Sequence, residues 1–239
     1  MGLNRIYTFG GSPLKNADGN PIGYEWFPFP NDYISYYLYE DNLNDVTGSF
    51  NMNNTITGGT ITYSTGGPNA PGTYMNMAFE GAGNRIDSVD FQLNTENITE
   101  FSYCGWFRGH NSAVNQIAYS MGKNTFYLLW LNSQNAWYTQ GVFNDKMTTM
   151  TSKTAWYHFG MVYTATNIKF YLNGNTTPLI DRNGSYSVAP SFPAYTWSHT
   201  IGQEDYADIA YQSAYSYAST IIYDRVITAA EYAQIYEFS

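Results

Sequence analysis

The chain has 239 residues, of which 44% are hydrophobic, 18% aromatic and only 12% charged. Average soluble domains carry about 25% charged residues, so about half of the usual charge is missing. A disordered chain would be poor in aromatic residues and rich in charge, which excludes disorder for most of this one. Its apolar runs are a few residues long, far short of the roughly 20 that a membrane helix needs. The sequence therefore predicts a globular protein without membrane insertion.

Charge and cysteine content exclude two further classes. Lys and Arg total 10 against 19 Asp and Glu, which gives a net charge of −9. Binding to a phosphate backbone depends on clustered Lys and Arg, and the chain has no such cluster, so we expect no nucleic-acid partner. The single Cys104 excludes an internal disulfide and a zinc site built from cysteines.

Residues 1–32 differ in composition from the rest of the chain. Four of the nine prolines lie there, at Pro13, Pro21, Pro28 and Pro30, which predicts an extended N-terminal arm rather than a folded unit. The arm also holds several aromatic residues, which a solvated linker would lack. We expect them to pack on the remainder of the chain, with a partner chain as the alternative. No apolar h-region follows the first Met, so we also expect no signal peptide.

Short runs rich in Tyr, Phe, Ile, Val and Thr alternate with turn residues along the chain, which predicts an antiparallel β-sandwich or barrel. Residues 132–135 and 164–167 are expected to form hairpin loops between neighbouring strands. Asn173 and Gly174 predict a tight turn, because both tolerate positive φ. The clearest predicted strands are 101–107, 125–131, 136–142, 155–163, 168–172 and 219–226.

One helix is predicted, at the C-terminal end of the sequence. Thr228 and Glu231 have the spacing of a capping box, in which each side chain accepts a hydrogen bond from the other residue's backbone amide. Ile227 and Tyr232 have the spacing of a hydrophobic staple around that cap. Ile235 extends the apolar face, so the helix is expected to pack on the sandwich.

Several of these segments resemble the laminin G-like domains of the concanavalin A-like lectin and glucanase superfamily. Residues 155–163 and 168–174 are similar to the family's "W-x-H … Y-v-N-G" core. Residues 101–107 resemble its "f-t-i-s-a-W-v" strand, Ile201-Gly202 its "i-G" element, and 221–228 its closing strand.

The resemblance covers about residues 33–239 and implies a two-sheet antiparallel jelly roll, in agreement with the strand pattern. The sequence departs from the family at 218–220, where the family has a Gly and an acidic residue. In some members that region helps to bind calcium. The fold alone does not fix function, because it serves lectins, hydrolases and scaffolds.

No catalytic motif is recognised, and we interpret the chain as not an enzyme. The glucanases of the superfamily carry Glu-x-Asp-x-x-Glu on one strand, and this spacing does not occur here. A Gly-x-Ser-x-Gly elbow and a phosphate loop ending in Gly-Lys-Ser/Thr are also lacking. His158, Cys104, Trp106 and Trp156 fall in predicted strands. Cys104, Trp106 and Trp156 are interpreted as core residues, and His158 as a core or hydrogen-bonded residue.

Sugar binding is the function that this fold suggests. A pyranose ring has an apolar C–H face and a rim of hydroxyl groups, so its sites pair a flat aromatic ring with polar side chains. Packing in the core or at an interface is the alternative for each ring. The candidate platforms are Trp130, Trp137, Trp197, Tyr206 and Tyr211, with Asn135, Asp205 and Asp208 as hydroxyl partners.

A calcium site is the one cofactor that the sequence suggests. Glu204, Asp205 and Asp208 lie in the acidic segment 203–208, and Ca²⁺ takes six to eight oxygen ligands. A solvated acidic loop is the alternative.

Two functions from different classes remain open. The first is a virion structural or adhesion protein, such as a phage-type capsid decoration, fibre or tail-associated subunit, located on the virion surface. It would present a lectin-like domain to glycans or a host surface and contact other virion proteins, or copies of itself, through residues 1–32. The second is a carbohydrate-binding module of a cellular extracellular protein. Self-association through the arm would favour the first, and a monomer with affinity for sugars the second.

Overall fold

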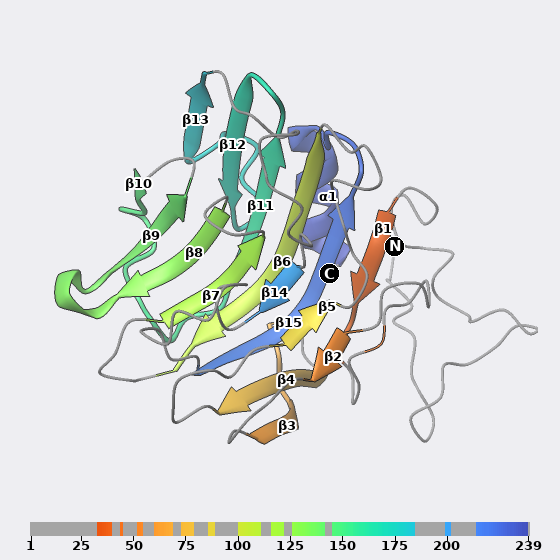
Figure 1. Ribbon diagram of the computed structural model, residues 1–239, viewed down its shortest axis with the longest axis vertical. Helices are drawn as coiled ribbons and strands as arrows, with labels where there is room; N and C mark the ends of the chain where they lie inside the picture. Colours follow the sequence, from red (N-terminus) through yellow and green to blue (C-terminus); the bar gives the residue numbers. More distant parts are fainter. Residues whose placement is uncertain are drawn as a thin grey trace, which may run out of the picture.

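The computed structural model is built from antiparallel β-strands, with a single α-helix in the part of the chain that it describes (Figure 1). The described residues are 33–39, 44, 52–54, 60–68, 73–78, 86–88, 100–110, 116–121, 126–141, 145–184, 199–201 and 214–238. The predicted arm at 1–32 lies outside them.

The strands form two sheets. The eight-stranded sheet has the order β13-β12-β11-β6-β15-β4-β3, and β1 pairs with β15. Its strands are β1 (Tyr33–Tyr37), β3 (Thr60–Thr65), β4 (Thr73–Ala78), β6 (Phe101–Gly109), β11 (Tyr157–Tyr163), β12 (Asn167–Leu172), β13 (Ile180–Asn183) and β15 (Ala214–Tyr223).

The seven-stranded sheet has the order β10-β9-β8-β7-β14-β5-β2. Its strands are β2 (Met52–Asn54), β5 (Ile86–Ser88), β7 (Gln116–Met121), β8 (Phe126–Leu131), β9 (Ala136–Gly141), β10 (Asp145–Lys146) and β14 (His199–Ile201). The two sheets pack face to face. The predicted all-β sandwich of two antiparallel sheets is therefore confirmed.

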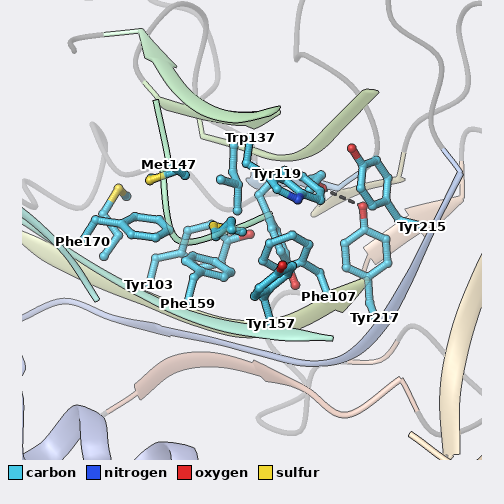
Figure 2. Close-up of a cluster of buried hydrophobic side chains, with 14 of the residues drawn as sticks. Tyr103, Phe107, Tyr119, Trp137, Met147, Tyr157, Phe159, Phe170, Tyr215 and Tyr217 are labelled. Atoms are coloured by element: carbon cyan, nitrogen blue, oxygen red, sulfur yellow. Dashed lines mark hydrogen bonds between the residues drawn. The ribbon is translucent and has the colours of Figure 1, made fainter. Parts of the chain in front are cut away.

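Aromatic side chains fill the space between the sheets (Figure 2). Tyr119 of β7 and Trp137 of β9 come from the seven-stranded sheet and meet Phe107 and Phe159 of the other sheet. The rings of Tyr119 and Phe159 lie 4.7 Å apart, and those of Phe107 and Trp137 5.1 Å apart in an edge-to-face arrangement. Such geometries are favourable between aromatic rings.

A second core lies on the opposite face of the eight-stranded sheet, beneath helix α1 (Ala229–Phe238). Cys104, Ile221, Tyr232 and Ile235 are buried in it. β6 serves both cores because successive side chains of a strand point to opposite faces: Phe107 faces the other sheet, whereas Cys104 faces the helix.

The helix begins as its sequence predicts. The Thr228 backbone N–H donates to the Glu231 carboxylate over 2.6 Å, and the Glu231 N–H donates to the Thr228 hydroxyl over 3.2 Å. Ile227 and Tyr232 are both buried in the second core, as the staple requires. The described residues include no helix that is long and apolar enough to cross a membrane.

The predicted turns are confirmed, whereas the strand boundaries differ by one or two residues in most cases and by more in β15. Asn173 and Gly174 have φ values of 49° and 72°, as the predicted turn requires. β11 begins at Tyr157 rather than at 155. β15 begins at Ala214 rather than at 219 and ends at Tyr223 rather than at 226, and Ile227 beyond it is buried in the second core.

Candidate functional site

The structure places two of the predicted sugar platforms in the interior. Trp130 on β8 and Trp137 on β9 are 2% and 0% exposed. They form a cross-strand pair whose rings meet edge to face at 5.5 Å, and the Trp137 indole N–H donates to the Ser152 carbonyl. Both side chains point toward the opposite sheet, so neither presents a ring face to solvent. Their interpretation as platforms is corrected to core packing.

Of the other residues predicted to bind sugar or calcium, the structure describes only Asn135. Asn135 is exposed at the end of a 3₁₀ turn (η2, Asn132–Gln134), and its φ of 48° and its backbone bond to Asn132 account for its presence there. Trp197, Tyr206, Tyr211, Glu204, Asp205 and Asp208 lie outside the described residues. Within the described ranges, no three His, Cys, Asp or Glu side chains are grouped to hold a metal ion.

His158 is buried and hydrogen-bonded, as predicted. Its ring stacks on Tyr232 with centroids 5.3 Å apart, and its Nδ1 lies 3.2 Å from the Tyr232 hydroxyl. That hydroxyl donates to the His158 carbonyl, so Nδ1–H is the donor of the ring contact. Burial lowers the pKa of His158 to about 3, which keeps the ring neutral. Cys104 and Trp106 are also buried, as predicted.

Trp156 differs from its prediction, because it is half-buried rather than part of the core. It immediately precedes β11 and belongs to a cluster on the outer face of the eight-stranded sheet, the face that α1 covers elsewhere. This group, here called the Arg108 cluster, consists of Tyr74, Asn76, Arg108, His110, Trp156 and Ser216.

Strand register assembles the Arg108 cluster from distant parts of the chain. Ser216 of the central strand β15 pairs with Asn76 of β4 on one side and with Arg108 of β6 on the other. Arg108 follows Phe107, which faces the other sheet, so the alternation of side chains places Arg108 on the outer face.

Hydrogen bonds link the polar members into one directional chain. The Ser216 hydroxyl donates to the Asn76 side-chain oxygen over 2.6 Å, and the Asn76 amide donates to the Ser64 hydroxyl over 2.8 Å. Because the single proton of Ser216 is used, His110 Nε2 must be the donor in its 2.8 Å contact with the same hydroxyl. Arg108 Nη2 also donates to it, over 3.3 Å.

Aromatic rings hold the guanidinium of Arg108 in place. Its central carbon lies 5.2 Å from the ring centroid of Tyr74 and 5.0 Å from that of Trp156, within the range of cation–π attraction. The two rings meet edge to face at 5.3 Å, and Nη2 donates to the Tyr74 hydroxyl over 3.2 Å. Partial burial, together with the charge of Arg108, lowers the pKa of His110, which is therefore neutral at pH 7.

Arg108 differs from the other described arginines, each of which forms an ion pair with a carboxylate. Arg182 pairs with Asp145, and Arg225 pairs with Glu231 at 3.0 Å. Within the described part of the chain, no carboxylate lies within salt-bridge distance of Arg108. The cluster thus combines a partly exposed indole, a phenol, a cation that no described carboxylate pairs and a prearranged set of polar groups. Such a surface suits a ligand with apolar and hydroxyl-bearing faces.

This cluster was not predicted from the sequence. Trp156 matched the family motif and was therefore assigned to the core. Side chains alternate between the two faces along 155–163, however, and Tyr157 and Phe159 face inward, so Trp156 faces outward. Period-two alternation is the signal that could have placed Trp156 and Arg108 on the outer face.

Comparisons with known proteins show the fold and no closer relationship. No family model and no curated protein matches the sequence. A sialidase of Trypanosoma rangeli, solved with a difluorinated sugar acid, superposes with a TM-score of 0.64 at 11% identity, over 97% of this chain and 36% of that one. The chain thus spans about a third of the length of that enzyme.

Two further structures are similar. Domain 4 of AbnA, a GH43 extracellular arabinanase of Geobacillus stearothermophilus solved with arabinotriose, has a TM-score of 0.56 at 15% identity, over 85% of this chain and 98% of the domain. A botulinum neurotoxin type C structure, whose description concerns two ganglioside molecules, has a TM-score of 0.57 at 11% identity, over 87% and 51%. At these identities the comparisons establish a shared β-sandwich fold.

Proposed function

We propose that this protein is a non-catalytic glycan-binding β-sandwich and that the Arg108 cluster is its sugar-binding surface. The observation that carries the proposal is the partly exposed Trp156 ring beside the prearranged donors and acceptors of Arg108, Asn76 and His110. An aromatic ring contacts the C–H face of a pyranose while polar groups bind its hydroxyls. The glycans named for the similar structures, arabinotriose and gangliosides among them, support the same ligand class.

The biological setting that we propose for this glycan-binding domain rests on the sequence. A laminin G-like domain in a virion structural or adhesion protein, located on the virion surface or outside cells, fits the charge-poor composition and the Pro-rich arm. A carbohydrate-binding module of a cellular extracellular protein is the alternative. Sedimentation of the full chain and of a chain lacking residues 1–32 separates them: self-association that depends on the arm favours the virion role, and a monomer that binds sugars favours the module.

A glycan array and a polysaccharide pull-down test sugar binding, run with Ca²⁺ and again with EDTA. We expect Trp156→Ala to lose most of the binding. Tyr138→Ala is the matched control, because Tyr138 is a half-buried aromatic residue on β9 of the other sheet, where it bonds Gln134. Melting temperatures of both variants control for unfolding.

The alternatives give different results in the same experiment. Loss of binding in EDTA would favour the predicted calcium site at 203–208. Binding that survives Trp156→Ala would place the site elsewhere, with Trp197, Tyr206 and Tyr211 the next candidates. Binding to no glycan would contradict the proposal, and release of sugar products from a bound glycan would contradict the absence of catalysis.

A further inference from the structure

Arg108 is unusual in this acidic protein because its charge is not paired with a carboxylate among the described residues. The chain carries a net charge of −9, and carboxylates neutralise the other two arginines of the described ranges. Among the residues that the structure describes, only neutral groups contact Arg108: the Tyr74 phenol, the Trp156 indole, the Ser216 hydroxyl and, beside them, a neutral His110. Partial burial of a cation without a counter-charge costs desolvation free energy, and a bound anion would offset that cost.

The guanidinium also keeps donors free in a fixed orientation. Both of its hydrogen bonds, to Tyr74 and to Ser216, come from Nη2. Its Nε–H and its two Nη1–H bonds have no partner among the described residues, although a guanidinium offers five donors. Arg108 is partly exposed, and the two aromatic rings restrict its movement. Little conformational entropy would then be lost when an anion accepts from these donors.

We infer that the Arg108 cluster selects glycans that carry a singly charged acid group, a carboxylate or a sulfate ester, placed against Nε and Nη1 of Arg108. This inference rests on the proposed function. The sugar ring would contact the exposed part of Trp156 while its acid group accepts charge-assisted hydrogen bonds, which are about twice as strong as neutral ones. One guanidinium among neutral neighbours matches one negative charge, and the acidic remainder of the protein disfavours more highly charged polymers.

The test is an array of matched glycan pairs that differ only in the acid group: a uronate and its methyl ester, a sialylated and a desialylated oligosaccharide, a sulfated and an unsulfated galactan. The strongest pair then goes to titration calorimetry with the full chain. We expect the acidic member to bind about 10-fold to 100-fold more tightly, since hydrogen bonds to charged groups are among the strong ones. The size of the preference in the carboxylated pairs and in the sulfated pairs then shows whether the cluster binds a carboxylate or a sulfate ester.

Two variants assign the preference to a residue. Arg108→Gln should abolish the preference and Arg108→Lys should retain part of it, because a lysine keeps the charge but not the geometry. Arg182→Gln is the control, an exposed arginine of β13 whose charge is already paired with Asp145. It should leave the preference intact. Circular dichroism and melting temperature show that each variant is folded.

Each result either supports or overturns the inferred preference for acidic glycans. An acidic preference that Arg108→Gln removes and Arg182→Gln keeps supports the inference. Equal binding of acidic and neutral partners, or a preference that Arg108→Gln leaves unchanged, overturns it while the proposed glycan binding stands. Binding to no member of any pair overturns both.

Discussion

Gly160 and Tyr232 show how closely the helix approaches the sheet. A Cβ atom at position 160 of β11 would collide with the Tyr232 ring of α1. The ring is held there by its hydroxyl, which donates to the His158 carbonyl over 2.9 Å. A side chain larger than hydrogen at position 160 therefore forces the helix away from the sheet.

Gly160→Ala should lower the free energy of unfolding by about 1–3 kcal/mol, the usual cost of overpacking. Urea denaturation measures it. In a Tyr232→Ala background the same substitution should cost much less, because the colliding ring is gone. An equal cost in both backgrounds would mean that the glycine is needed for a reason other than this contact.

His158 makes stability depend on pH. Its pKa of about 3 in the folded protein lies below the usual value of about 6.5 in an unfolded chain. As pH falls below about 6.5, the unfolded chain takes up a proton that the folded protein does not, so stability falls with pH down to about 3. From pH 7 to pH 5 the expected loss is about 2 kcal/mol.

Denaturant unfolding at several pH values measures this slope, and His158→Gln should flatten it. His110 has a lowered pKa as well and contributes in the same direction, so His110→Gln should flatten the slope less. A slope unchanged in His158→Gln would contradict the assignment.

Helix α1 is stabilised by its first turn. The reciprocal hydrogen bonds of Thr228 and Glu231 satisfy amides that the helix itself leaves unpaired, and Arg225 adds an ion pair to Glu231. Burial alone would raise the pKa of Glu231, but the bonds from Thr228 and the charge of Arg225 outweigh it and lower that pKa.

Thr228→Ala should cost about 1 kcal/mol of stability, the typical value for a lost N-cap. Thermal unfolding followed by far-ultraviolet circular dichroism measures the change. Thr151→Ala, at an exposed position outside any strand, is the control and should have little effect. Similar losses in the two variants would show that the capping box contributes nothing specific.

Elements with local signals were predictable, and the Arg108 cluster was not. The helix cap, the Asn173-Gly174 turn and the strands around them depend on neighbours a few residues apart. Arg108 meets Tyr74 and Ser216 across 34 and 108 residues, and only the pairing of β6, β15 and β4 brings them together. The orientation of Trp130 and Trp137 depends likewise on which sheet face each strand turns inward.

In the core of the sandwich, tyrosine takes many positions that aliphatic residues would otherwise fill. Burial raises the pKa of Tyr39, Tyr103, Tyr119 and Tyr215, which are 0% or 1% exposed. Two of their hydroxyls donate hydrogen bonds inside the sandwich: Tyr39 to the Thr220 hydroxyl over 3.0 Å and Tyr119 to the Trp106 carbonyl over 3.2 Å. Ionisation of these phenols is incompatible with the folded state.

Stability should therefore fall as pH rises above about 10, where tyrosines of the unfolded chain lose protons that the folded protein retains. Phenolate absorbance during an alkaline titration measures this. In the native protein the buried fraction should titrate only together with loss of near-ultraviolet circular dichroism, whereas in guanidinium chloride all tyrosines should titrate near the ordinary pKa. A full titration with the dichroism signal intact would contradict tyrosine burial.

The position of β15 also bears on how the protein is made on the ribosome. This strand follows every other strand in the sequence, yet it lies inside its sheet and pairs with β1, β4 and β6. Until it is synthesised, β6 and β4 have no partner on the edges that it occupies, and unpaired edges invite association with other chains. We expect the nascent chain to remain dependent on chaperones until residues 214–223 emerge, and premature termination before them to yield aggregates rather than a smaller sandwich.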